Sequence, residues 1–248
     1  MKHAPLIFKN HMRCADCPIR ARAICAYCEP DELVALDAIK SYKTYGAGEV
    51  ITWVGDDMEV LGSVVSGVAT LSRTLADGRR QMVGLMLPSD FIGRPGRKTA
   101  PYDVVAANTV IICQFNKPQF EALISTTPHL ERRLLDMTMD ELDAAREWML
   151  LLGRKTAREK IASLLAIIAR RDGVLNDRVV KGDLHLTLPL SREAMADYLG
   201  LTIETVSRQM SGLKKAGIIM LEDGRHIHVP DFTALLEAAG DDSDTVQS

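Results

Sequence analysis

Four of the chain's five cysteines stand in its first 28 residues, and this clustering restricts what the N-terminus can be. The sequence reads Cys14-Ala-Asp-Cys17, then seven residues, then Cys25-Ala-Tyr-Cys28. Residues 1–30 have little apolar periodicity, so we expect them to take their shape from whatever the cysteines bind. The fifth cysteine, Cys113, lies far downstream in an apolar run. A site that includes it forms only when the chain folds.

In a reducing compartment, cysteines this close together indicate a metal or redox site rather than a disulfide framework. The residues alone leave two interpretations open. The four N-terminal cysteines form a zinc-like pattern, although their seven-residue spacer is shorter than the usual roughly 12–20. Cys113, on a strand face with Ile111 and Phe115, has the setting of a small buried hydrophobic residue.

Charge is distributed unevenly along the chain. The whole protein has a net charge of −3, which does not by itself indicate a nucleic-acid partner. Residues 154–229 contain 13 Lys and Arg against 9 Asp and Glu, a net of +4, which leaves −7 for the rest. The apolar runs are too short to span a bilayer, and we see no cleavable leader, so we expect a cytoplasmic protein without a membrane partner.

The segment 31–128 reads as a short helix, residues 31–40, followed by a β roll. Short β-branched runs between turn sequences predict strands over residues 41–115, and Asp77-Gly78 predicts a hairpin. Phe120, Leu123 and Ile124 then predict one short helix.

Residues 129–153 have the periodicity of one long helix, which we expect to end at Gly153. Its apolar stripe is spaced close to 3.5 residues, as in a two-stranded seam, and predicts a homodimer; an ordinary core-facing helix is the alternative. The predicted seam residues are Leu130, Leu134, Met137, Glu141, Ala145, Trp148 and Leu152.

Residues 154–239 predict a winged helix-turn-helix, with Ser191 and Thr202 as the two caps and Gly200 in the turn. On the exposed side of the second helix, Glu204, Ser207 and Arg208 have the chemistry to read base edges. The alternative for Glu204 and Arg208 is an exposed i,i+4 ion pair. The candidate phosphate contacts are Thr202, Thr205, Gln209, Lys214, Lys215 and Arg225.

The remaining features carry less chemistry. The histidines show no ligand spacing, and His226 and His228 are assigned to the wing. The polar tail, 240–248, is predicted to be disordered. We find no glycine-rich phosphate loop, Ser/His/Asp arrangement or nicotinamide fingerprint, so the chain is not expected to be an enzyme or an electron carrier.

The order of these parts resembles the CRP/FNR family of bacterial transcription regulators. The most specific stretch is Leu199-Gly-Leu-Thr-Ile-Glu-Thr-Val-Ser-Arg208, which contains the Glu-x-x-Ser-Arg pattern of FNR-type recognition helices. The segment Leu87-Pro-Ser-Asp-Phe-Ile-Gly93 is similar to the family's Gly-Asp-Phe-Ile-Gly strand. The seven-residue cysteine spacing resembles the alphaproteobacterial FnrL/FnrN branch.

The resemblance implies an α+β fold: an N-terminal cluster segment, a jelly-roll sensor domain like those that bind cyclic nucleotides, a long dimerisation helix and a winged helix-turn-helix. It implies an oxygen-labile 4Fe-4S cluster on Cys14, Cys17, Cys25 and Cys113, with Cys28 as the spare thiol. It also implies binding to double-stranded DNA at paired TTGAT-type half-sites and contact with RNA polymerase. Because Arg94-Pro95 replaces the family's Glu-Leu and no phosphate clamp follows, we expect no cyclic nucleotide. The alternative function is a zinc-stabilised regulator that senses a small molecule in the roll.

Overall fold

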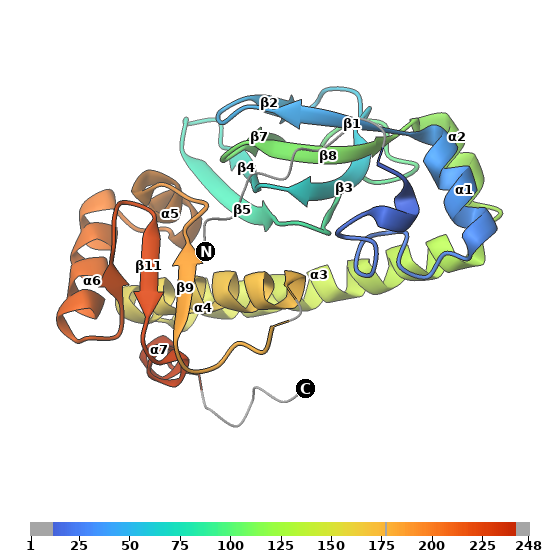
Figure 1. Cartoon of the computed structure of the whole chain (residues 1–248). Helices are drawn as coiled ribbons and strands as arrows, with labels where there is room; N and C mark the ends of the chain where they lie inside the picture. The colour runs from blue at the N-terminus through green and yellow to red at the C-terminus, as the bar shows by residue number, and fades with distance from the viewer. Residues whose placement is uncertain (1–11, 177, 242–248) are drawn as a thin grey trace. The chain divides into compact units, whose positions relative to one another are not determined.

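The computed structural model describes residues 12–176 and 178–241 (Figure 1). The chain divides into two compact units. One contains the chain up to Ala69 together with Leu85–Asp140, and the other contains Thr70–Gly84 together with the chain from Glu141. The first 11 residues of the predicted cluster segment and residues 242–248 of the predicted tail lie outside the described residues.

Two four-stranded sheets form the predicted β roll, which confirms the α+β fold class. One sheet has the strand order β1-β8-β3-β6, and the other has the order β2-β7-β4-β5. In chain order the strands are β1 Lys40–Tyr45, β2 Val50–Thr52, β3 Leu61–Ser66, β4 Ala69–Thr74, β5 Arg80–Met86, β6 Phe91–Ile92, β7 Asp103–Ala106 and β8 Val110–Phe115. Gly78 turns the predicted hairpin between β4 and β5 with a φ of 87°, where a side chain would be strained.

One turn of the roll contains a residue that is unusual for its backbone conformation. Ser89 has a φ of 82° and is the one non-glycine residue with positive φ among the described residues. It stands where the family's Gly-Asp-Phe-Ile-Gly motif begins with glycine, so this departure from the motif places a side chain in a region that favours glycine.

Short helices close one end of the first unit. Pro30 starts α1, Pro30–Ile39, where Glu29 and Glu32 form a capping box. Asn116 caps α2, Lys117–Ile124, and presents Phe120 to the core. The Phe120 ring stacks on Phe115 of β8 with centroids 4.7 Å apart. This core also contains Leu36, Leu61, Leu130 and four of the cysteines: Cys14, Cys25, Cys28 and Cys113.

The predicted long helix is α3, Pro128–Arg154, 27 residues long. The expected end at Gly153 is wrong by one residue, because Gly153 lies inside the last turn. The seam prediction is also wrong for Leu130, whose side chain is fully buried in the chain's own core. Leu134 and Met137 pack partly against that same core, and Trp148 stacks on Tyr198 with ring centroids 3.8 Å apart.

A different apolar line of α3 is exposed. Leu135, Met139, Leu142 and Met149 are between 41% and 64% exposed. Their spacings of four, three and seven residues continue a 3.5-residue repeat. We call these four residues the α3 stripe. The α3 stripe is displaced from the predicted seam by about one residue along the sequence, which is roughly 100° around the helix.

The second unit contains the predicted winged helix-turn-helix. Its helices are α4 Ala157–Leu175, α5 Arg192–Leu199, α6 Ile203–Lys215 and α7 Phe232–Ala239, and its three-stranded sheet has the order β10-β11-β9, with β9 Leu184–Thr187, β10 Met220–Leu221 and β11 His226–Val229. α4 begins with a capping box of Thr156 and Glu159 and buries Ile161, Leu164 and Leu165. α7, which was not predicted, packs on α4 and ends just before the polar tail. Within the described residues, no helix is both long and apolar enough to cross a membrane.

Candidate metal centre and nucleic-acid interface

The N-terminal cysteines lie on a run of tight turns that folds against the first unit. A short 3₁₀ helix, η1 Cys14–Asp16, begins this run. Ile19 and Ile24 are at most 5% exposed and anchor it in the core. The Arg20 guanidinium closes it by donating to the carbonyl oxygens of Ala26 at 2.8 Å and Cys28 at 2.9 Å. We call residues 12–29 the cysteine segment.

Four thiols from two distant parts of the chain line one cavity of about 10 Å³. Cys14, Cys17 and Cys25 come from the cysteine segment, and Cys113 comes from β8. Their other neighbours in the cavity wall are mostly apolar. Cys28 is also buried, but it is not part of this wall. The four predicted ligands therefore line one cavity, and Cys28, which lies near Cys25, is outside its wall.

Burial makes these thiols hard to ionise. It raises the pKa of Cys14 to about 12, with a further contribution from a hydrogen bond to Asp37, and it raises the pKa of Cys113 as well. Lys40 acts in the opposite direction on both groups. A thiolate is the form that binds metal, so four such ligands require strong positive charge at this position.

Two hydroxyl groups also line the cavity. The Tyr42 hydroxyl lies beside the Cys17 thiol, and the buried Ser63 hydroxyl has no hydrogen-bond partner among the described residues. An unpaired buried hydroxyl costs free energy, and such groups can donate to the sulfur atoms of a bound cluster.

A single ion is a poorer match for the cysteines. A single metal ion needs at least three ligand atoms close together. Among the described residues, no three cysteine sulfur atoms all lie within 4.8 Å of one another. A multi-iron cluster spreads its ligands more widely than one zinc ion does. The arrangement of donors therefore fits an iron–sulfur cluster better than zinc.

Arg133 of α3 holds the cysteine segment directly. Its guanidinium donates to the carbonyl oxygen of Arg22 at 2.5 Å and to that of Ala23 at 3.3 Å, and it lies over the Tyr27 ring at 5.4 Å. These bonds join residues 110 or more positions apart. Nothing in the local pattern of either segment indicates them, which is why the sequence did not reveal Arg133.

Gly62 permits close packing at Cys113. It lies on β3, and a Cβ atom there would be 2.3 Å from the Cys113 carbonyl oxygen. Only glycine lets the two strands approach this closely.

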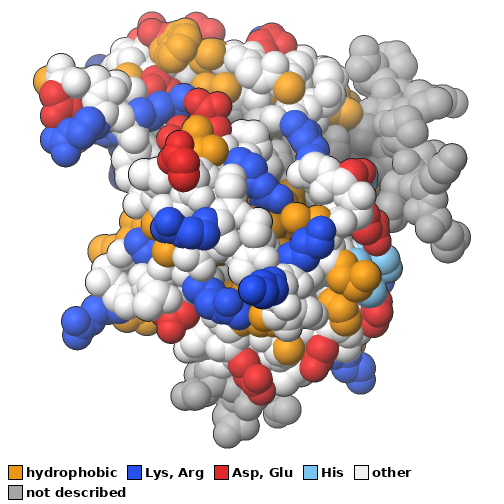
Figure 2. Space-filling view, turned by 90° about the vertical axis from the view of Figure 1, so that its left-hand side faces the viewer, with side chains coloured by type: hydrophobic (Ala, Val, Ile, Leu, Met, Phe, Trp, Pro, Cys, Tyr) orange, Lys and Arg blue, Asp and Glu red, His pale blue; other side chains and the backbone are white. Residues whose placement is uncertain are grey.

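The helix-turn-helix positions one exposed helix face. The Ser191 hydroxyl accepts from the backbone N–H of Ala194 and caps α5. Gly200 turns the chain with a φ of 63°, and the Thr202 hydroxyl accepts from the N–H of Thr205 to cap α6. Val206 and Met210 are buried, so the opposite face of α6 points to solvent. Figure 2 views the molecule from the side on which Figure 1 shows α6, and several Lys and Arg side chains are visible on that side of the molecule.

All three predicted base readers lie on this exposed face. Glu204, Ser207 and Arg208 are exposed, and Arg208 donates to the Thr205 hydroxyl at 3.4 Å. Within the described chain no ion pair joins Glu204 to Arg208, so the i,i+4 alternative is absent. Hydrogen bonds from the backbone N–H of Glu204 and from Thr202 lower the pKa of the Glu204 carboxyl, which keeps it ionised and able to accept.

The candidate phosphate contacts differ in availability. Thr202 is engaged as the cap, and Thr205 and Gln209 are half-buried. Lys214 and Lys215 are exposed in the last turn of α6, and Arg225 is exposed in the wing turn.

Two family models match the chain in the order of its parts. A cyclic nucleotide-binding domain matches residues 42–127, and a Crp-like helix-turn-helix domain matches residues 159–238.

Full-length relatives also match. The chain is 62% identical over 232 residues to the transcriptional activator protein FnrL of Cereibacter sphaeroides, covering 94% of each chain. It is 39% identical to the nitrogen fixation regulation protein FixK of Bradyrhizobium diazoefficiens, covering 88% of this chain and 91% of that protein. Among solved structures, FixK2 from Bradyrhizobium japonicum matches with a TM-score of 0.72 and 32% identity, over 81% of this chain and 97% of FixK2.

The Arg133 contacts generate a prediction about the cysteine segment. Arg133→Ala removes two hydrogen bonds from a charged donor, so local opening of residues 12–29 should become easier by about 2 kcal/mol, or roughly thirtyfold. Amide hydrogen exchange of the cluster-free, full-length protein measures this change. Arg132→Ala is the matched control, since Arg132 is the exposed neighbour. Equal exchange in both variants would show that Arg133 does not hold the segment.

Proposed function

Because the chain belongs to the CRP/FNR family of transcription regulators, we propose that it is an oxygen-responsive transcriptional activator that carries a 4Fe-4S cluster. The observation that carries this proposal is the single cavity lined by Cys14, Cys17, Cys25 and Cys113. The names of the relatives, FnrL among them, support the role of activator. This role places the protein in the cytoplasm.

The four thiols fit the chemistry of the cluster. Iron supplies the positive charge that stabilises buried thiolates, and a bound cluster supplies reactivity toward oxygen. Lys40 and Arg20, which already favour the charged thiolates electrostatically, offset part of the negative charge of the ligand set. The buried Ser63 hydroxyl would gain an acceptor.

The cysteine segment would adjust when the cluster binds. The cavity that the four thiols line is about 10 Å³, which is close to the space that one water molecule needs. Such an adjustment would act on the bonds from the segment's carbonyl oxygens to Arg133. Arg133 is on the side of α3 that faces the cysteine segment, roughly opposite the exposed stripe, so it links that segment to the pairing helix.

We propose that a second copy of the chain covers the α3 stripe. Four exposed apolar side chains at a 3.5-residue repeat are the arrangement that a two-stranded seam requires. Of the originally predicted seam, Glu141 and Ala145 are exposed and can flank the contact, while Leu134, Met137, Trp148 and Leu152 are half-buried. A change of a few kcal/mol in the free energy of dimerisation is enough to shift the equilibrium between monomer and dimer.

The paired chains present two α6 helices to a two-fold-symmetric DNA site. In dimeric helix-turn-helix proteins the recognition helices read half-sites about one turn apart, roughly 34–36 Å. Glu204, Ser207 and Arg208 are proposed to read bases in TTGAT-type half-sites, and Lys214, Lys215 and Arg225 to contact phosphates. The exposed β4–β5 hairpin is a candidate contact for RNA polymerase. We do not propose a cyclic nucleotide ligand, for the sequence reasons given above.

The ligand set is tested by metal analysis of protein purified without air. Cys113→Ser should lose iron and acid-labile sulfide together and should lower the dimer fraction, because one of four thiolates is missing. Cys28→Ser is the matched control and should keep both. Unchanged iron in Cys113→Ser would contradict the proposed ligand set, and zinc without sulfide in the wild type would favour the zinc-stabilised regulator.

The pairing surface is tested with a charge on the α3 stripe. Leu142→Glu loses the burial of a leucine in each copy, about 1.5–3 kcal/mol per side chain, and should weaken anaerobic dimerisation at least roughly tenfold. Sedimentation velocity measures the dimer fraction. Ala144→Glu places the same charge at an exposed position of α3 that is off the stripe and should leave pairing unchanged. Equal dimer fractions would place the interface elsewhere.

Base reading is tested on α6. Arg208→Ala should cost about 1–3 kcal/mol of specific binding and relax the preference at one base position. Lys215→Ala should instead weaken binding to all sequences. It should also reduce the slope of log K against log salt concentration by about one. Binding titrations on half-site variants distinguish the two patterns. A uniform loss in Arg208→Ala would identify Arg208 as a phosphate contact.

A further inference from the structure

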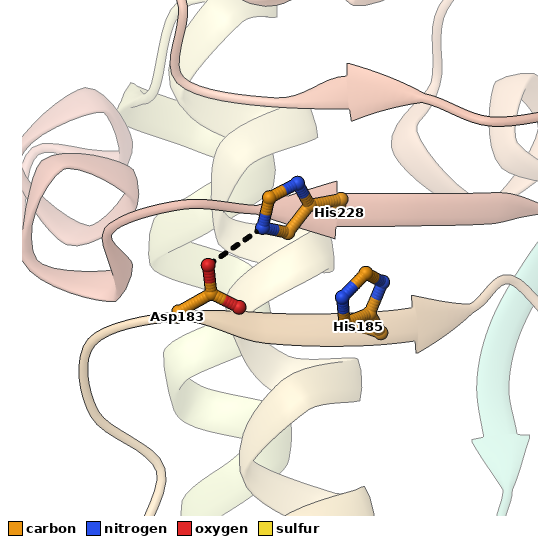
Figure 3. A group of neighbouring side chains, drawn as sticks. All are labelled: Asp183, His185 and His228. Atoms are coloured by element: carbon orange, nitrogen blue, oxygen red, sulfur yellow. Dashed lines mark hydrogen bonds and ion pairs between the residues drawn. The ribbon is translucent and has the colours of Figure 1, made fainter. Parts of the chain in front are cut away.

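Three side chains that are separated in sequence meet on the wing sheet of the second unit. His185 on β9 and His228 on β11 are directly opposite each other in the antiparallel register, and Asp183 lies just before β9. Cross-strand partners project from the same face of a sheet, so the two imidazole rings are neighbours. Figure 3 shows all three side chains on this face.

The ligand atoms of the three side chains are close together. One ligand atom from each of Asp183, His185 and His228 lies within 4.8 Å of the other two, and this is the one such group among the described residues. The two rings stack with centroids 4.5 Å apart and planes 10° apart. The Asp183 carboxylate is 2.8 Å from Nε2 of His228. Two imidazoles and a carboxylate within this span can bind a single ion.

A fourth residue orients one of the imidazoles. Oε1 of Glu222, which follows β10, is 3.0 Å from Nδ1 of His185. Metal-binding histidines commonly use one ring nitrogen for a carboxylate in this way and leave the other for the ion. The group is open to solvent, since the side chains of Asp183 and His185 are both 64% exposed.

We propose that Asp183, His185 and His228 form a binding site for a divalent transition-metal ion of the zinc class. Two imidazole nitrogens and one carboxylate oxygen select such ions over magnesium and calcium, which prefer oxygen alone. Water completes the coordination, as is common in sites with three protein ligands. The ion ties β9 to β11, the second strand of the wing, and Arg225 lies in the turn that leads into β11. This site is separate from the cysteines and does not depend on the proposed cluster.

The test compares zinc content between matched histidine variants of the full-length protein. Each protein is dialysed against the same free Zn²⁺ concentration and its bound zinc is measured by atomic emission. The cysteines also bind zinc, but they are identical in every variant, so differences report on the wing. His226→Gln is the control, because His226 is on the same strand, two residues away, and pairs with Asp223 instead.

The wild type should bind one more zinc ion per chain than His185→Gln or His228→Gln, and His226→Gln should match the wild type. Zinc should also raise the midpoint of thermal unfolding of the wild type and of His226→Gln by more than that of the other two. Binding should weaken at acidic pH, since protons compete for the imidazoles. Equal zinc content in all four folded proteins overturns the proposal. Circular dichroism checks folding, and Asp183→Asn, which keeps a side chain of the same shape, replaces any histidine variant that fails to fold.

Discussion

A thiolate in an apolar core is unstable unless positive charge lies beside it, and this constraint governs the whole first unit. Cys14, Cys25, Cys28 and Cys113 share one core with Leu36, Leu61 and Phe120. Without metal, their raised pKa values keep the thiols protonated, and the cysteine segment packs as an ordinary apolar layer. The proposed cluster would reverse this preference, because iron makes the charged form the stable one. Under that proposal the segment would have two stable states, one with the cluster and one without it.

Helix α3 carries two apolar lines, one packed against the chain's own core and one exposed. Leu130, Leu134 and Met137 face the core that contains the cysteines, while Leu135, Met139, Leu142 and Met149 are exposed. Arg133 flanks the core-facing line and holds the carbonyl oxygens of Arg22 and Ala23. A change on the packed side of α3 could reach the exposed side as a small rotation or shift of the helix. Movements of this size are those that interfaces between helices amplify.

Local sequence patterns predicted most of the fold. β-branched runs between turns, the Asp77-Gly78 hairpin, and the caps at Ser191 and Thr202 all indicate elements that the structure contains. The choice of stripe on α3 was not available from the sequence. Both lines are apolar with similar spacing, and only long-range packing decides which one the chain's own core uses. α7 was missed because it is short and lies beside a polar tail.

Some site residues could likewise be predicted from local sequence patterns, and others could not. The exposed face of α6 follows from helical periodicity, whereas the four-cysteine set depended on resemblance to a family, because no local signal links Cys113 to the N-terminus. The Asp183, His185 and His228 group depends on the register of two strands whose histidines are 43 positions apart. The Tyr42 and Ser63 hydroxyls are visible only once the cavity is known.

The small volume of the cavity among the four thiols has a mechanical consequence. The cavity of about 10 Å³ leaves little free space among the four thiols, so binding of the proposed cluster would require the residues around them to adjust. Gly62 lies with its backbone against the Cys113 carbonyl oxygen, so β8 has no room to yield toward β3. Any adjustment would therefore fall mainly on the cysteine segment, which Arg133 of α3 holds by two hydrogen bonds. The proposed response to oxygen would then be a change in the packing of this segment against α3.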